Sequence, residues 1–453
     1  MVFGLSFDKV APTAMPAPTA NETTLPIPPL ELGMMTFSRE RHGALRVGIV
    51  VRIIGEMFTD QMLANAVTIV QQRHPLLRAT MNADDEFVVK QTLPVRCGRH
   101  VRAHDVSWQD VWDSMGAYQI GSPLWGLTLV APGSQGSNCT FELMLTAEHA
   151  VGDGRSLSHL MHELLCHLTE QAPPSTTPTP VPPFIEQAMA SWTQNLPWST
   201  YLKLACGLGL ANPVLAFLRW KSTPLRPPDN VDFTESSARW STVTLAQSET
   251  ESLVQLARAN GVTLTTLLMA LVMEQLPSSA TWPASCLCPV DLRGRYPTGR
   301  IPADRVSFHV QTTRIRVERS EDPWQVARQC REAIQCQLSD GTVFAMARLA
   351  SMGVTVVGAR MRPDRNQAPM GFLSNLGVVP IQPRYGSRVV QEVVPVLHTP
   401  PINLRQCMAV TAAGRLTLAF RTPDVDQDDA DPNRFASAVR DRIQHLLAEA
   451  KAS

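Results

Sequence analysis

Hydrophobic positions in the first third of the chain switch between strand and helix spacing. Residues 43–54, GALRVGIVVRII, are rich in valine and isoleucine and predict a strand. The next segment, 59–81, predicts a helix that Thr59 or Asp60 can cap. Its apolar residues recur at helical spacing: Met62, Leu63, Ala66, Ile69 and Val70.

A second strand and a strongly amphipathic helix follow. The strand over 140–149 has one apolar face, made by Phe141, Leu143, Leu145 and Ala147 and extended by His149. The helix after it has one continuous stripe, formed by Leu157, Leu160, Met161, Leu164, Leu165 and Leu168.

The last part of the chain repeats this alternation. Strands are predicted over 239–245 and 307–317, and helices after Gly261, at Asp322 and at the end of the chain. Cys286 and Cys288 lie on a further predicted strand, where we expect one buried and one exposed thiol. Residues 1–30 are rich in proline and are predicted to be extended over the surface.

The two series indicate two α/β layers that face each other. A Pro/Thr-rich linker, 172–184, separates them. We therefore predict an N-terminal domain over 1–184, a linker or crossover over 185–237, and a C-terminal domain over 238–453. The length of 453 residues suits two domains.

The composition of the chain limits which binding partners and which cell compartment we expect. Lys+Arg and Asp+Glu are both 40, so there is no electrostatic case for nucleic acid or an anionic membrane as the main partner. Nine scattered cysteines without a CxxC pair, and no signal-like N-terminus, predict a cytoplasmic protein with free thiols. No transmembrane segment is predicted, since the most apolar stretch, 201–220, is broken by Asn212 and Pro213 and is expected to be a packed helical pair.

The segment AEHAVGDGRSLSHL, 147–160, is the strongest candidate for chemistry. His149 ends a strand with an apolar inner face, and Gly152 and Gly154 keep bulk away from it. Histidine is the side chain best suited to accept a proton near neutral pH. From the segment alone, a general base and a core histidine in a tight turn are about equally favoured.

Asp153 has two interpretations. It could orient the imidazole of His149, or it could form an ion pair that fixes the turn. A buried aspartate needs a partner, and the best candidate elsewhere is Arg293 in CPVDLRGRY.

Other patterns argue against several site types. In HELLCH, 162–167, the second histidine is one residue too far along a helix for a zinc-protease motif, and no metal site is predicted. His159 and His162 lie off the apolar stripe and are expected to be solvated. Neither a GxSxG elbow nor a phosphate-binding P-loop is present.

The pattern HAVGDG, 149–154, resembles the HxxxDG signature of the chloramphenicol-acetyltransferase-like superfamily. That superfamily includes BAHD acyltransferases, alcohol acetyltransferases, polyketide-associated acyltransferases and condensation domains. Further segments similar to the superfamily occur in the expected order: RHPLLRATM at 73–81, SPLWGLTLV at 122–130, GVTLTTLLMALVM at 261–273, CPVDLRGRY at 288–296 and GFLSNLGVV at 371–379. The resemblance runs from about residue 35 to about residue 425.

The resemblance implies an α/β fold with mixed sheets, in which two similar domains enclose an active-site tunnel at their interface. His149, Asp153 and Gly154 would be the catalytic motif, and Arg293 would pair with Asp153 as a structural ion pair. Ser374 and Asn375 would stabilise the oxyanion on the acceptor side. The implied reaction moves an acyl group from a thioester to a hydroxyl or amine of a small natural-product acceptor, with His149 as general base.

The resemblance implies no permanently bound cofactor and no metal. The co-substrate would be acyl-CoA or an acyl-carrier-protein thioester, and the protein is expected to be a monomer. Two departures matter: Glu148 stands where condensation domains have a first histidine, and the plant-type DFGWG segment is absent. The first favours a free-standing acyltransferase over a peptide-synthetase domain. The second favours the alcohol-acetyltransferase and polyketide-associated branches and leaves the carrier of the thioester open. The alternatives are a chamber adapted to a cyclisation or pericyclic step, and a non-catalytic binding protein of the same fold.

Overall fold

The fold is seen in a computed structural model. It describes residues 22–452, except 41–42, 96, 102–106, 133–138, 172, 174, 176, 195, 201–239, 277–283, 297–298, 350–369, 399–403 and 423–430. The apolar stretch 201–220 lies outside the described residues.

The first large sheet has six strands in the order β12-β13-β2-β7-β6-β5. They are β12 (Arg384–Tyr385), β13 (Arg388–Leu397), β2 (Arg46–Gly55), β7 (Cys139–Glu148), β6 (Trp125–Ala131) and β5 (Cys97–Val101). All neighbours are antiparallel except β5 and β6. This sheet delivers His149, which follows the last residue of β7.

The second large sheet also has six strands, in the order β10-β9-β11-β14-β15-β8. They are β10 (Val310–Val317), β9 (Ala284–Asp291), β11 (Met370–Val378), β14 (Leu404–Ala412), β15 (Arg415–Arg421) and β8 (Ser241–Thr244). The pairs β9–β11 and β11–β14 are parallel, and the others are antiparallel. Both large sheets are mixed, which confirms the predicted fold class. A small third sheet joins β1 (Thr23–Pro26), β4 (Glu86–Val89) and β3 (Ala79–Met81).

One strand crosses between the two halves. β13 comes from the last quarter of the chain, yet it pairs with β2 over Val389–Leu397 in the first sheet. It then leads back to β14 in the second sheet. The domain limits drawn from sequence stay a prediction, but the chain segment 384–397 belongs spatially with the N-terminal sheet.

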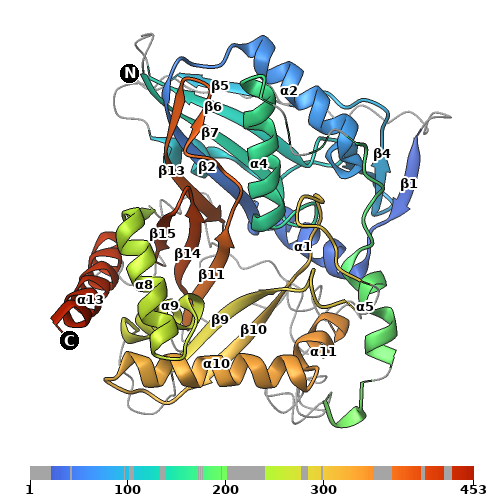
Figure 1. Cartoon of the computed structure of the whole chain (residues 1–453). Helices are drawn as coiled ribbons and strands as arrows, with labels where there is room; N and C mark the ends of the chain where they lie inside the picture. The colour runs from blue at the N-terminus through green and yellow to red at the C-terminus, as the bar shows by residue number, and fades with distance from the viewer. Residues whose placement is uncertain are drawn as a thin grey trace.

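Helices cover both sheets (Figure 1). α2 (Asp60–Arg73) and α4 (Gly154–Leu168) pack together at the first sheet, while α8 (Gln247–Ala259), α9 (Leu264–Glu274), α10 (Pro323–Ser339) and α13 (Pro432–Ala452) surround the second. The remaining helices are α1 (Pro29–Glu40), α3 (Trp108–Ser114), α5 (Ile185–Gln194), α11 (Thr342–Leu349) and the short 3₁₀ turn η1 (Pro75–Arg78). Thr59 caps α2 and Asp322 caps α10, as the sequence predicts.

Four local expectations are wrong. The helix predicted over 59–81 ends at Arg73, because Pro75 opens a 3₁₀ turn and residues 79–81 form β3. β7 ends at Glu148, so His149 lies in the turn after it. Cys286 and Cys288 are both buried, because residues two apart in a strand share one face. Pro29 begins α1 inside the region that we expected to be extended.

Within the described residues, no single helix has the length and apolar character needed to cross a membrane, although α8 and α9 pass that test together as a pair bent by 94°.

Gly48 sits where the first sheet has no room for a side chain. A Cβ there would lie 2.7 Å from Trp112 Cζ3 and 2.9 Å from the Leu145 carbonyl oxygen, and the backbone cannot yield easily. We predict that Gly48→Ala lowers the free energy of unfolding by about 1–3 kcal/mol. Gly98→Ala in β5 is the matched control, since its Cβ would meet only Thr128 side-chain atoms at 3.6 Å or more. Denaturant unfolding measures both; equal losses would contradict the packing described for β2 and β7.

Candidate active site

His149 is the first residue of the turn between β7 and α4. Val151 N–H donates to the Glu148 carbonyl at 3.0 Å, which closes the turn. The Nδ1 of His149 lies 3.2 Å from the Gly152 carbonyl oxygen. Because that oxygen can only accept, the contact requires a proton on Nδ1 and leaves a lone pair on Nε2. Nε2 itself makes no hydrogen bond with the described residues.

Burial sets the proton affinity of His149. Desolvation lowers its pKa below the ordinary value of 6.5, and the negative charge of Asp153 acts in the opposite direction. The edge of the ring meets Phe308, with centroids 5.1 Å apart at 86°. The imidazole is therefore held in its neutral form, the form that can accept a proton.

Asp153 caps α4 and at the same time binds the segment that joins β9 and β10 of the second sheet. Its Oδ1 accepts from Ser156 N–H at 3.0 Å, the N-cap bond of α4. Its Oδ2 accepts from His309 N–H at 3.0 Å and lies 2.7 Å from Nη1 of Arg293. The carboxylate makes no hydrogen bond to the ring of His149, whose bond goes to Gly152.

Arg293 is the partner of that carboxylate. Its side chain is 2% exposed, and it also lies 3.2 Å from Asp291 Oδ1 and donates to the Ser307 carbonyl at 2.8 Å. Burial raises the pKa of Asp153, but the charge and hydrogen bond of Arg293 hold it below its usual range. Both groups are thus charged in the folded protein.

Gly154 allows the second sheet to approach the start of α4. A Cβ there would lie 2.7 Å from Leu376 Cδ2, on β11. This position places Gly154 in the packing between the two halves rather than in contact with a polar group.

Ser374 and Asn375 lie on β11 and line the same cavity as His149. The side chain of Asn375 is already used: Nδ2 donates to Thr265 Oγ1 at 3.0 Å, and Oδ1 accepts from Gly377 N–H at 2.9 Å. Ser374 makes no such side-chain bond with the described residues. Of the two, the Ser374 hydroxyl is the freer donor.

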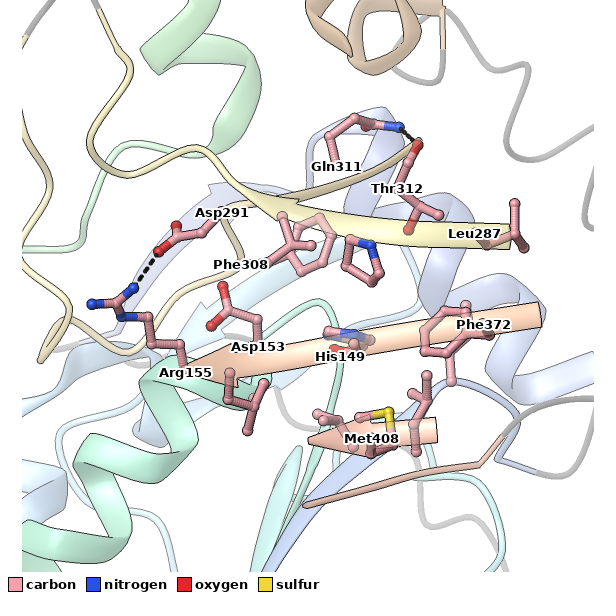
Figure 2. A pocket seen from close by; sticks show the side chains of 18 of the residues that line it. His149, Asp153, Arg155, Leu287, Asp291, Phe308, Gln311, Thr312, Phe372 and Met408 are labelled. Carbon is pink, nitrogen blue, oxygen red and sulfur yellow. Dashed lines mark hydrogen bonds and ion pairs between the residues drawn. The ribbon is translucent and has the colours of Figure 1, made fainter. Parts of the chain in front are cut away.

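The cavity around His149 has a volume of about 510 Å³. Its wall comes from both large sheets: Val47 and Leu397 from the first, and Leu287, Val310, Phe372 and Met408 from the second. Figure 2 shows His149 between Phe308 and Met408, with Asp153 and the Arg155–Asp291 pair toward one end. The chamber is a mostly apolar space, with His149 in its wall and the charged groups Asp153, Arg155 and Asp291 toward one end.

The structure adds residues that the sequence reasoning missed. Phe308 contacts His149, and Leu30 and Met34 of α1 close one wall of the cavity. Arg155 and Asp291 line it as a pair at 3.2 Å. Arg155 directly follows Asp153-Gly154, and Asp291 lies two residues before Arg293, so both could have been proposed as site residues from their closeness to the motif residues. The sequence held no comparable signal for the apolar residues of the wall.

The histidines of α4 differ from expectation. His162 is buried, with Nδ1 2.6 Å from the Tyr385 hydroxyl, so its predicted solvation is wrong; His159 is partly exposed. Glu163 binds Arg73 and His74. No cluster of three or more histidine, cysteine or acidic side chains in the described part of the chain is arranged to hold a metal ion.

Comparison with known proteins supports the same fold. Residues 234–421 match the family model described as the C-terminus of phthiocerol/phthiodiolone dimycocerosyl transferase. No curated protein sequence matches the chain significantly.

Solved structures match over nearly the whole chain. Polyketide synthase associated protein 5 from Mycobacterium tuberculosis has 16% identity and a TM-score of 0.63, over 92% of this chain and 96% of that one. A trichothecene 15-O-acetyltransferase from Fusarium sporotrichioides has 12% identity and a TM-score of 0.68, over 94% and 95%. The first condensation domain of the calcium-dependent antibiotic synthetase has 14% identity and a TM-score of 0.61, over 96% and 98%. These likenesses confirm the resemblance inferred from the sequence and the two-domain fold that it implies.

The Asp153–Arg293 contact predicts a pattern of stability. Removing Arg293 leaves the buried Asp153 carboxylate without its cation, and removing Asp153 leaves Arg293 with only the more exposed Asp291; breaking a buried pair costs about 3–5 kcal/mol. Asp153→Ala and Arg293→Ala should each lower the free energy of unfolding by that order, and the double variant should lose less than the sum of the two. Equilibrium unfolding of the four proteins measures the coupling. Additive losses would mean that the two charges do not stabilise each other.

The same pair predicts a pH dependence. The folded-state pKa of Asp153 is depressed, so its contribution to stability is present above the ordinary aspartate pKa of 3.8 and is lost as the pH falls through the lower folded value. The stability difference between wild type and Asp153→Asn should therefore shrink in acid. A difference that stays constant from neutral pH to acid would contradict the charged state assigned to Asp153.

Proposed function

We propose that this chain, which has the two-domain fold of the chloramphenicol-acetyltransferase-like superfamily, is an acyltransferase. It moves an acyl group from a thioester to a hydroxyl or amine of a small acceptor. The observation that carries the proposal is the state of His149: Nδ1 is held by the Gly152 carbonyl, and Nε2 has no hydrogen bond with the described residues in a side chain that lines a mostly apolar cavity.

The first step is proton abstraction. Nε2 of His149 accepts the proton of the acceptor hydroxyl or amine as its oxygen or nitrogen attacks the thioester carbonyl. The lowered pKa of His149 keeps this nitrogen unprotonated at neutral pH. The Gly152 carbonyl fixes the ring orientation of His149. In a Ser-His-Asp triad, the aspartate carboxylate has this role.

The second step is collapse of the tetrahedral intermediate. Its negative oxygen needs a hydrogen-bond donor in a site shielded from water, and the Ser374 hydroxyl lines the cavity with no side-chain hydrogen bond to the described residues. The C–S bond then breaks, the acyl group stays on the acceptor, and the thiolate takes the proton back from His149. No proton or electron is left over.

Direct transfer suits this site better than an acyl-enzyme. An enzymatic nucleophile needs a base within hydrogen-bond reach, and none of the described hydroxyls or thiols bonds to Nε2 of His149. Asp153 is engaged with Arg293, Ser156 and His309, so it positions the turn rather than reacting.

The donor is a thioester carried by coenzyme A or by an acyl carrier protein. A mostly apolar chamber of about 510 Å³ can take an acyl chain. Incubating the protein with acyl-CoA and a set of alcohols and amines, and following thiol release together with the acylated product, tests the reaction. Conversion of an acceptor without a thioester would favour the cyclisation alternative instead.

His149→Ala should lose turnover while keeping the fold. A positioned general base contributes about 10²–10⁴-fold, so kcat should fall by that factor. His445→Ala is the matched control, because that histidine lies exposed on α13. A His149→Ala protein with wild-type turnover on its substrate would refute the role of the base.

The pH profile should report the same group. Since burial lowers the pKa of His149, the neutral base is already formed at pH values below 6.5. We expect kcat/KM to rise with pH along an acid limb centred below 6.5 and to be level from there to neutrality. A limb centred above 6.5 would mean that another group, or a more solvated histidine, controls the rate.

A further inference from the structure

A second cavity, of about 570 Å³, adjoins the reaction cavity and is basic. Its wall contains four arginines, Arg155, Arg293, Arg295 and Arg300, and a single acidic residue, Asp291. The mechanism above uses only Arg293 from this set, and only as the partner of Asp153. The other three cations have no part in it.

The loop after β9 presents three of these arginines. Asp291 Oδ1 accepts from Arg293 N–H at 3.0 Å, and Ile301 N–H donates to the Arg293 carbonyl at 3.0 Å. These bonds hold the two ends of the 291–301 segment together. Arg295 and Arg300 are exposed on it, at the rim of the cavity.

The arginines that line this cavity outnumber the acidic side chains that could pair with them. The side chains of Arg295 and Arg300 form neither an ion pair nor a hydrogen bond with any described residue. The Nε atoms of Arg155 and Arg293 are buried and also have no acceptor in the described structure. These two Nε atoms are shielded from the cavity, so the excess positive charge that makes its wall complementary to an anion comes from the exposed guanidinium groups of Arg295 and Arg300. Arginine's planar fork suits carboxylate and phosphate.

The basic cavity is close to the reacting atoms. Arg155 and Asp291 line both cavities, so the two are neighbours separated by this one ion pair. Arg293 touches Asp153, which is four residues from His149 and shares its cavity. An anion bound here therefore lies near the reacting centre. The phosphate of a pantetheine arm, by contrast, lies at the far end of a long chain from its thioester.

We propose that the arginine-lined cavity is an anion subsite for the acceptor. It takes a carboxylate or phosphate carried close to the acceptor's reacting hydroxyl or amine and so directs that group toward His149. The assignment of the anion to the acceptor rests on the acyl transfer proposed above; the existence of the anion site does not.

Calorimetry with three probes tests the subsite without turnover. The probes are inorganic phosphate, 3-hydroxydecanoate and its methyl ester; the last two share an apolar tail and a hydroxyl and differ only in charge. Wild type should bind phosphate, more weakly as salt rises, and should bind the acid at least about tenfold more tightly than the ester. In the double variant Arg295→Gln/Arg300→Gln, phosphate affinity should fall about tenfold or more and the acid should lose its advantage.

Arg328→Gln, an exposed arginine on α10, is the control and should behave as wild type. Equal binding of acid and ester by wild type, or unchanged phosphate binding in the double variant, would overturn the proposal. Coenzyme A titrated into the same proteins gives the third arm. If the double variant weakens coenzyme A binding but not the preference for acid over ester, the anion belongs to the donor and the acceptor assignment is wrong.

An acyl-transfer assay on the same proteins separates the two proposals. Absence of any transfer, with acid and ester still discriminated, refutes the proposed reaction and leaves the anion site in place. Acyl transfer without any discrimination between acid and ester supports the proposed reaction and refutes the anion site.

Discussion

The buried ion pair between Asp153 and Arg293 is the constraint on which the site depends. Asp153 caps α4, which packs on the first sheet, and Arg293 follows β9 of the second. Two charges with 1% and 2% exposure are tolerated only when their remaining hydrogen bonds are satisfied. Ser156 N–H, His309 N–H, Asp291 and the Ser307 carbonyl supply most of those bonds. A shift of either half would break the ion pair and the His309 N–H bond together, so these contacts fix how the halves meet.

That fixed junction explains the form of the reaction chamber. The turn that Asp153 holds contains His149, and the wall opposite consists of strands from the second sheet. Arg73 adds a second tie nearby, since it binds Glu163 of α4 and Asp304 of the 299–309 segment. The polar groups at the junction are thus spent on structure. Within the described residues, Nε2 of His149 and the Ser374 hydroxyl have no hydrogen-bond partner, and both side chains line the mostly apolar cavity. The proposed base-catalysed acyl transfer uses these two groups.

Local pattern predicted most of the elements. The apolar stripe of α4 follows from side-chain spacing, the strand β2 from its valine and isoleucine content, and the helix starts near Thr59 and Asp322 from residue type; Arg293 was found as the best partner for a buried Asp153. The long-range features could not be found in that way. β13 pairs with β2 across more than 300 residues, and Phe308 and Met408 reach His149 only through the tertiary fold. His162 shows the same limit, because Tyr385, which buries it, comes from the distant strand β12.

The central claim is that His149 promotes a direct transfer in which the protein is never acylated. Intact-protein mass spectrometry, after incubation with acyl-CoA and no acceptor, tests it most directly. The account predicts an unmodified mass under those conditions, with acylated product and free thiol formed only once an acceptor is added. An acylated protein that discharges its acyl group onto the acceptor would contradict it.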